Sequence, residues 1–393
     1  MKKIAIAVAA ALTAAGAGAA DFTLYGIVDT GLGYTNVNPI EGPTVNKFEM
    51  INGYNCGSRF GFKGTEDLGN GYAVSFVLEN GFSSDSGTLG QGGRMFGREA
   101  QLKFHTPYGT LSFGRAGTLL SGAGTLDIWG GNADVLPGGW DGIFNIGNYY
   151  GNGTRLDNMV TYQTPTAAGF TGYLQYSFAN DTKSGDDDSR ANERNNNRYF
   201  AAGLTYKNGP VSAVVIYDTT MFRHYTPNSA EAPLDPESTP NLGDSRTISV
   251  GGSYDFGVVK VTAYGQYVKG ARSVWADGVG LGGSIWRNDL VENGEKVGSY
   301  ADADGYNFHL GAQVPVPCGR LYAGAYYGKL EGNDSVSNDE ATNLNLLLAH
   351  EYDLSKRTII YSGIGYKQID YDTDVADEKE TATQVIMGLR HIF

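Results

Sequence analysis

The chain has 393 residues, with 29 Lys and Arg against 42 Asp and Glu, which gives a formal net charge of −13. This acidity argues against a nucleic-acid partner, which requires a basic surface. The mean hydropathy of −0.28 excludes a bundle of membrane helices, because each helix needs about 20 mostly apolar residues. The 57 Gly and 26 Tyr favour strands and tight turns over helices.

The first twenty residues form a separate segment. They begin with Lys2 and Lys3, continue with an apolar run to about Leu12, and end in the small residues AGAGAA. This order is typical of a secretory signal peptide that is removed from the mature protein. The apolar run is too short and too rich in alanine for a membrane anchor. We therefore expect residues 1–20 to be cleaved and residues 21–393 to form a single domain outside the cytoplasm.

From Asp21 onward the recurrent pattern is a period-two alternation over roughly ten residues, as expected of β-strands. In one such segment Val74, Phe76 and Leu78 share a face. The predicted strands are 22–35, 58–67, 71–82, 94–106, 109–116, 156–164, 169–180, 198–207, 211–220, 245–255, 258–269, 304–314, 319–330, 341–353, 356–370 and 381–393. Short turns and long loops alternate between them, which predicts an up-and-down meander with all short turns at one end.

The two faces of these strands indicate their surroundings. One face is apolar, with Tyr and Phe near its ends, and the other carries Gly, Ser, Thr, Gln and charged residues. Sixteen strands enclose a lumen too wide for side chains to fill, and lipid cannot satisfy an open sheet edge. The pattern predicts an all-β fold: a closed, 16-stranded antiparallel transmembrane β-barrel in an outer membrane. The alternative is a large soluble all-β protein, and the apolar face that ends at Phe393 argues against it.

Several short blocks, spread over the mature chain, carry a family resemblance. They are LYGIVDT (24–30), SRFGFKGTEDLGNG (58–71), FGREA (96–100), GTLSFGR (109–115), RLDNMVTY (155–162) and GLRHIF (388–393). In this order and at these spacings the chain resembles the general porins of Gram-negative bacteria, most closely the β-proteobacterial type. The resemblance implies an outer-membrane homotrimer that passes small hydrophilic solutes, with its third long loop folded into the lumen. Outer-membrane lipid, lipopolysaccharide and the barrel-assembly machinery, which would read Phe393, are the other expected partners.

The connection 117–155 is the longest and is rich in Gly and aromatic residues, among them Trp129 and Trp140. A loop of this length needs a function or a surface to pack on, and the lumen offers both. We expect this third extracellular loop to constrict the pore. The alternative is an extracellular cap.

A diffusion pore needs a water-filled path narrowed to about solute size, with opposed charges across it and no bond-making group. On the basic side we expect Arg59 and Lys63, which share a face of one strand, together with Lys103 and Arg98. The family's arginine cluster lies near Arg98. However, strict alternation from Leu102 places Arg98 outward unless a bulge intervenes, so its orientation stays open.

On the acidic side we expect carboxylates of the long loop, Asp127, Asp134 and Asp141, with Glu99, which shares a face with Lys103. For each of these charged residues the alternative is a solvated position without a role in permeation. Selectivity for anions or cations does not follow from the net charge, because most of the surplus acid lies in outer loops.

Alternation places Arg115 on the outward, apolar face. An arginine that faces lipid costs about 2–4 kcal/mol near the bilayer midplane and less near an interface. A neighbouring protomer that covers Arg115 would remove this cost, so we expect Arg115 in the trimer interface. The alternative is that its side chain extends to the polar rim.

Other motifs lack the context that their chemistry requires. The run GVGLGG (278–283) matches a dinucleotide fingerprint but has no strand before it and no helix after it. Five His are scattered singly, without metal-ligand spacing. Cys56 and Cys318 are expected at opposite ends of a barrel whose apolar band is about 25 Å tall, too far apart for a disulfide. We expect no catalytic residue, metal or cofactor.

The sequence thus predicts a non-enzymatic porin in the outer membrane of a Gram-negative bacterium. It would form a water-filled channel for passive diffusion of small hydrophilic solutes and ions, with its selectivity set by opposed charges at the loop constriction. Two alternatives stay open: a substrate-selective channel of the same fold, and a surface adhesin or ligand-binding barrel.

Overall fold

The computed structural model describes residues 21–40, 42–121, 126–136, 140–145, 154–183, 196–222, 244–271, 289–292, 295–299, 303–332, 340–372 and 377–393. The predicted signal peptide, residues 1–20, lies outside these ranges. Short helical turns are η1 (Gln91–Gly93), α2 (Gly130–Ala133) and η2 (Gly142–Phe144). Within the described ranges, no helix combines the length and apolar character that crossing a membrane requires.

The strands are β1 (Asp21–Asn38), β2 (Val45–Asn52), β3 (Arg59–Gly69), β4 (Tyr72–Gly81), β5 (Glu99–Thr106), β6 (Gly109–Gly117), β7 (Arg155–Gln163), β8 (Phe170–Ser177), β9 (Arg198–Asn208), β10 (Val211–Met221), β11 (Ser245–Asp255), β12 (Lys260–Ala271), β13 (Asp289–Glu292), β14 (Glu295–Ser299), β15 (Ala303–Val316), β16 (Gly319–Gly332), β17 (Glu340–Ser355), β18 (Thr358–Asp372) and β19 (Asp377–Ile392).

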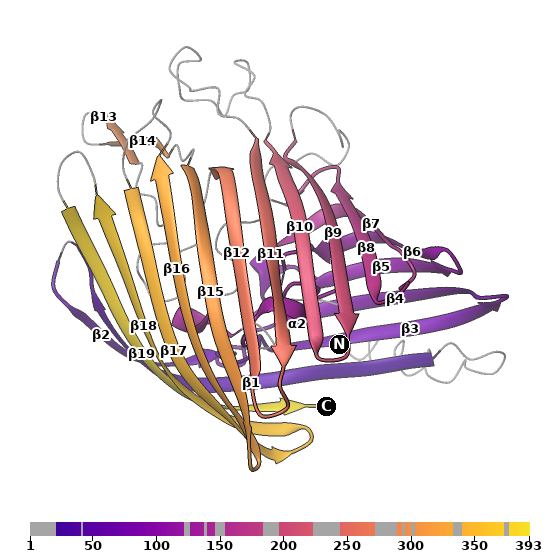
Figure 1. Cartoon of the computed structure of the whole chain (residues 1–393), viewed down its shortest axis with the longest axis horizontal. Helices are drawn as coiled ribbons and strands as arrows, with labels where there is room; N and C mark the ends of the chain where they lie inside the picture. The colour runs from indigo at the N-terminus through magenta and orange to yellow at the C-terminus, as the bar shows by residue number, and fades with distance from the viewer. Residues whose placement is uncertain are drawn as a thin grey trace.

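Sixteen of the described strands form a closed antiparallel ring (Figure 1), in which β1 pairs with β3 on one edge and with β19 on the other. The ring consists of β1, β3 to β12 and β15 to β19. These strands correspond one to one with the sixteen predicted segments. The predicted fold is therefore confirmed. The largest difference is at β5, which begins at Glu99 rather than at residue 94.

Three further strands lie where the sequence predicted loops. One edge of β1 pairs with β19. The other edge pairs with β3 at residues 21–27 and with β2 at residues 30–37. β13 and β14 form a separate hairpin. β2 was missed because successive charged and apolar residues, Lys47 and Phe48 among them, are both exposed, so the strand shows no alternation.

The wall separates two kinds of surface, as the alternation predicted. Outward side chains such as Val250 and Leu310 are apolar and exposed in the isolated chain. Inward side chains are polar and linked to one another: Gln266 Nε2 donates to Ser249 Oγ at 2.9 Å, and Asn307 Nδ2 donates to Gln266 Oε1 at 2.9 Å. The inside is therefore suited to water and the outside to lipid.

The ring closes at a contact between Gly26 on β1 and Phe393, which follows β19. Gly26 N donates to Phe393 O at 3.1 Å, and Phe393 N donates to Gly26 O at 3.0 Å. The Phe393 ring lies over Gly26, so a Cβ at residue 26 would overlap it. The terminal aromatic ring thus occupies the space left by a missing side chain.

We expect Gly26→Val to destabilise the folded barrel by about 1–3 kcal/mol, the usual effect of overpacking. The measurement is the temperature at which the compact barrel converts to the unfolded band in gel electrophoresis. Gly265→Val is the matched control, because Gly265 also lies on an outward face but the nearest atom to its Cβ position is 3.3 Å away. Equal transition temperatures for the two variants would contradict the prediction.

Candidate functional site: the lumen between loop and wall

The first half of the long loop packs on the inner face of β10 to β12. α2 contacts these three strands and lies inside the ring in Figure 1. The Trp129 ring meets the inward Tyr264 ring at a centroid distance of 5.2 Å. A Cβ on the inward Gly251 would lie 2.6 Å from Ala133 Cβ, so the absent side chain makes room for the loop.

The second half of the loop packs on β16 to β19. The Trp140 ring lies 5.5 Å from Tyr361, and Ile143 N donates to Gln384 Oε1 at 3.2 Å. Here too an inward glycine provides the space, because a Cβ on Gly363 would lie 2.6 Å from the Phe144 ring. The described loop therefore follows the inner faces of β10 to β12 and β15 to β19.

A second inward segment, residues 53–58, joins the loop. The Tyr54 side chain lies against Gly33 on the inner face of β1. Asp141 N donates to Tyr54 O at 2.8 Å, and Asn55 Nδ2 donates to Glu351 Oε1 at 2.8 Å. This segment also reaches the wall formed by β3 to β7, because Arg59 Nε donates to Gly57 O at 3.1 Å.

A buried carboxylate, Glu79 on β4, organises the basic residues of this wall. Arg98 Nε lies 2.6 Å from Glu79 Oε1, and Arg59 Nη1 lies 4.0 Å from the same oxygen. Tyr25 Oη donates to Glu79 Oε2 at 3.0 Å. Because β4 directs Glu79 inward together with Val77, Arg98 and Arg59 are held on the lumen side.

Alternation did not determine the position of Arg98, because β5 begins one residue later, at Glu99. Arg98 N donates to Glu79 O at 3.2 Å, and its side chain then turns to the Glu79 carboxylate. On β5, Glu99 accepts from Gln101 Nε2 at 2.6 Å, and Lys103 lies on the same inward face. Lys63, on β3, is exposed, with its Nζ 5.2 Å from the Tyr25 ring centroid.

Two residues of the site were missed from the sequence, Glu79 and Arg155. Arg155 begins β7 and lies within electrostatic range of Arg59 and Arg98. Among the described residues it forms no ion pair. Glu79 could have been found, because the alternation on β4 places it on the lumen face. Arg155 had no such signal, because it lies at the junction of the long loop with β7.

The four predicted acidic residues do not lie together. Burial and, to a smaller extent, the neighbouring Asp134 together raise the pKa of Asp127 to about 7. Burial also raises the pKa of Asp134, to about 6, against the effect of the Leu136 and Val135 amides. Lys207 interacts with Asp127, and Lys260 with Asp134. Both carboxyls therefore face lysines of the wall against which the loop packs.

Asp141 is exposed, and its Oδ1 accepts from Gly142 N at 2.9 Å at the start of η2. Glu99 is the remaining predicted acidic residue and lies on the opposite side, in the wall that carries the arginines. Of the three loop carboxylates, Asp141 is the exposed one.

Arg115 lies beside Ala100 in the register of β5 and β6, on the outward side. Its Nη1 is 2.5 Å from Asp157 Oδ1, and its Nε donates to Gly97 O at 2.8 Å. The charge is thus compensated within the chain, so a neighbouring protomer is not needed to compensate it. A role for Arg115 in the trimer interface stays a prediction.

Within the described ranges, no group of three or more His, Cys, Asp and Glu side chains is placed to hold a metal ion. Both cysteines are free. Cys56 is buried, with its backbone N donating to Asp29 Oδ2 at 2.7 Å, and Cys318 is exposed in the turn between β15 and β16.

Known proteins resemble this chain over its whole length. A family model described as Gram-negative porin matches residues 5–374. An outer membrane porin protein of Bordetella pertussis is 36% identical, and outer membrane porin protein 32 of Delftia acidovorans is 28% identical, each over 100% of both chains. The anion-selective porin from Comamonas acidovorans has a TM-score of 0.64 at 23% identity, covering 95% of this chain and 100% of that one. OmpT of Vibrio cholerae, in its trimer form, has a TM-score of 0.59 at 15% identity, with 95% and 99% covered.

Proposed function

Because the chain belongs to the Gram-negative porin family and is an outer-membrane channel for passive diffusion, we propose that its arginine-bearing wall makes it prefer small anions. The pore is narrowed between the loop 117–155 on one side and β3 to β7 on the other. Small hydrophilic solutes pass through this gap, and the channel performs no chemical step on them.

The row of basic side chains opposite the loop carries this proposal. On this wall Arg59, Lys63, Arg98, Lys103 and Arg155 outnumber Glu79 and Glu99. Across the lumen, Asp127 and Asp134 face lysines, and Asp141 is exposed. A charged ring of one sign lowers the barrier for ions of the other sign. The printed name of the Comamonas porin, anion-selective, is consistent with this preference.

We also propose a homotrimer, the form named for OmpT. The outer face of β1, β3 and β4 carries an aromatic cluster in which Phe22 and Phe62 stack at 5.8 Å and Phe60 lies 6.3 Å from Phe82. Aromatic side chains in such a cluster suit a protein contact as well as lipid. The proposal keeps residues 1–20 as a cleaved signal peptide, Phe393 as the barrel-assembly signal, and lipopolysaccharide as a neighbour.

The test is conductance of the purified protein in planar bilayers under a KCl gradient. Current steps that close in threes are expected, with a reversal potential of the sign that chloride selectivity gives. A potential of the opposite sign would overturn the role of the arginine wall. The absence of conductance would overturn the open pore itself.

The reversal potential is expected to depend on pH through Asp127. Its pKa is raised from an ordinary 3.8 to about 7, so it is charged at pH 8 and neutral at pH 5.5. Acidification therefore removes a negative charge from the loop and increases the anion preference. The same raised pKa means that the packed loop binds this proton more strongly than a released loop, so packing weakens as pH rises from about 4 to 7.

Reversal potentials measured from pH 8 to 5.5 test this prediction, with Asp127→Asn as the comparison. The upper part of the titration is expected to disappear in the variant, leaving a smaller transition near pH 6 from Asp134. An unchanged titration in Asp127→Asn would contradict the assignment.

A further inference from the structure

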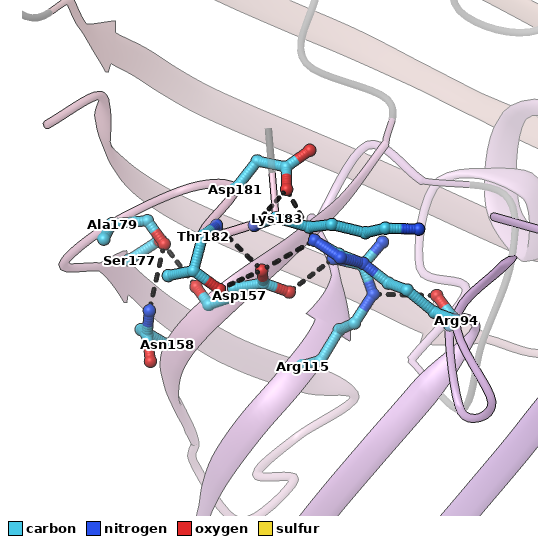
Figure 2. Close-up of polar contacts among 10 residues, drawn as sticks. Arg94, Arg115, Asp157, Asn158, Ser177, Ala179, Asp181, Thr182 and Lys183 are labelled. Carbon is cyan, nitrogen blue, oxygen red and sulfur yellow. Dashed lines mark hydrogen bonds and ion pairs between the residues drawn. The ribbon is translucent and has the colours of Figure 1, made fainter. Parts of the chain in front are cut away.

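Three segments that are far apart in sequence meet at the carboxylate of Asp157 (Figure 2). Arg115 Nη1 lies 2.5 Å from Asp157 Oδ1, and Arg94 Nη2 lies 3.1 Å from Oδ2. On the other side, Thr182 Oγ1 donates to Oδ2 at 3.0 Å, and Thr182 N donates to it at 3.1 Å. Arg94 and Thr182, from two different loops, and Arg115 of β6 thus share one carboxylate.

The backbone of β7 places Asp157 next to Arg115. The register between β6 and β7 shifts between Gly114 and Ala116, so two residues of β7 lie opposite Arg115. One of them, Asn158, has a φ of 50°. An extra residue of this kind kinks a strand and redirects a side chain. Here it brings the carboxylate to the outward side, where Arg115 lies.

Residues 94–98 cross the wall from this outward cluster to the lumen. Arg94 is held by Asp157 and by Asp181, whose Oδ1 lies 2.5 Å from Arg94 Nη2. Three residues later, the Gly97 carbonyl accepts from Arg115 Nε at 2.8 Å. The next side chain, that of Arg98, lies on the inward side against Glu79.

We infer that Asp157 is a positioning residue for the pore: it holds Arg94 and Arg115 outside the wall, and through them it fixes Arg98 inside. This inference rests on the proposed role of Arg98 in the arginine wall. The Asp157, Arg94 and Arg115 side chains are only 13%, 16% and 15% exposed, so solvent and salt screen these pairs less than they screen surface pairs. Without the Asp157 carboxylate, the guanidinium groups of Arg94 and Arg115 repel each other, and residues 94–98 are released.

The sign of the selectivity change distinguishes positioning from a direct charge effect. Asp157→Asn removes a negative charge, which by direct electrostatics makes the channel more selective for anions. Positioning gives the opposite result, because Arg98 leaves the wall and Glu79 loses its closest partner. We therefore expect the anion-to-cation permeability ratio to fall severalfold in Asp157→Asn, towards that of Arg98→Gln, and the open-channel current noise to rise.

The double variant Asp157→Asn/Arg98→Gln is expected to match Arg98→Gln alone, since coupled residues are not additive. Asp181→Asn is the matched control and is expected to change the ratio little, because Asp181 pairs with the same Arg94 but its side chain is 49% exposed and therefore screened by solvent. Should Asp157→Asn fail to fold, Arg115→Lys replaces it, since it keeps a charge for Asp157 but loses the Nε donor to Gly97.

Two results would overturn the inference while leaving the proposed function intact. The first is an anion-to-cation permeability ratio that rises or stays constant in Asp157→Asn while Arg98→Gln lowers it. The second is additive effects of the two substitutions in the double variant. A ratio that Arg98→Gln leaves unchanged would instead remove Arg98 from the arginine wall, and the inference with it.

Discussion

Replacing Arg155 with Gln is expected to lower the anion-to-cation permeability ratio severalfold. Arg98 and Arg59 share the Glu79 carboxylate, whereas Arg155 forms no ion pair among the described residues. Its charge therefore acts on solutes with less compensation. A unit charge about 7 Å from a permeating ion contributes about 0.6 kcal/mol in bulk water and about 2.4 kcal/mol at an effective dielectric constant of 20. For each ion this range corresponds to about a 3-fold to 50-fold change in permeability, in opposite directions for anions and cations.

Reversal potentials of the variant and the parent protein in the same KCl gradient provide the measurement. Arg246→Gln is the matched control, because Arg246 is exposed on the outward parity of β11, in line with Ile248. The control is expected to behave like the parent. If the Arg155 and Arg246 variants had equal ratios, the selectivity of the pore would not depend on this arginine.

Gly363→Val is expected to release the second half of the loop from the wall and lower the conductance. Its Cβ would lie 2.6 Å and 2.9 Å from two atoms of the Phe144 ring, and Trp140 packs on the same ring at 5.7 Å. The ring is thus held between Gly363 and Trp140. Overpacking of this kind costs about 1–3 kcal/mol, which shifts the equilibrium between packed and released loop by about 5-fold to 150-fold.

Single-channel recordings should then show a lower main level or long visits to partly closed levels. Gly131→Ala serves as the control, because Gly131 belongs to the same loop but no atom lies within 4 Å of its Cβ position. Full conductance without extra levels in Gly363→Val would mean that the contact with β18 does not hold the loop.

The strands could be predicted from the sequence because successive side chains of the wall face lipid and water in turn. This difference appears in the sequence as a period-two alternation. β2 lacks this contrast, since its residues are exposed in both directions, and it was missed for that reason. Arg98 shows a second limit. Alternation applies only inside a strand, and Arg98 precedes β5 by one residue.

The sequence of the loop does not predict its path along the wall, but the sequences of the wall strands contain an indication of it. Gly251, Gly311 and Gly363 occupy inward positions on their strands, and each provides space for a loop side chain. A glycine at an inward position therefore indicates a packed segment. No corresponding signal existed for Asp127 and Asp134, because their direction depends on the fold of the loop around them.

The two places where the loop is fastened have a mechanical consequence. α2 contacts β10 to β12, and η2 contacts β17 to β19, so two parts of the same loop are fixed to separate arcs of the ring. Flattening the ring into an ellipse changes the distance between its attachment points and must strain or break one of them. The contacts that hold the loop inside the barrel therefore also oppose flattening of the ring.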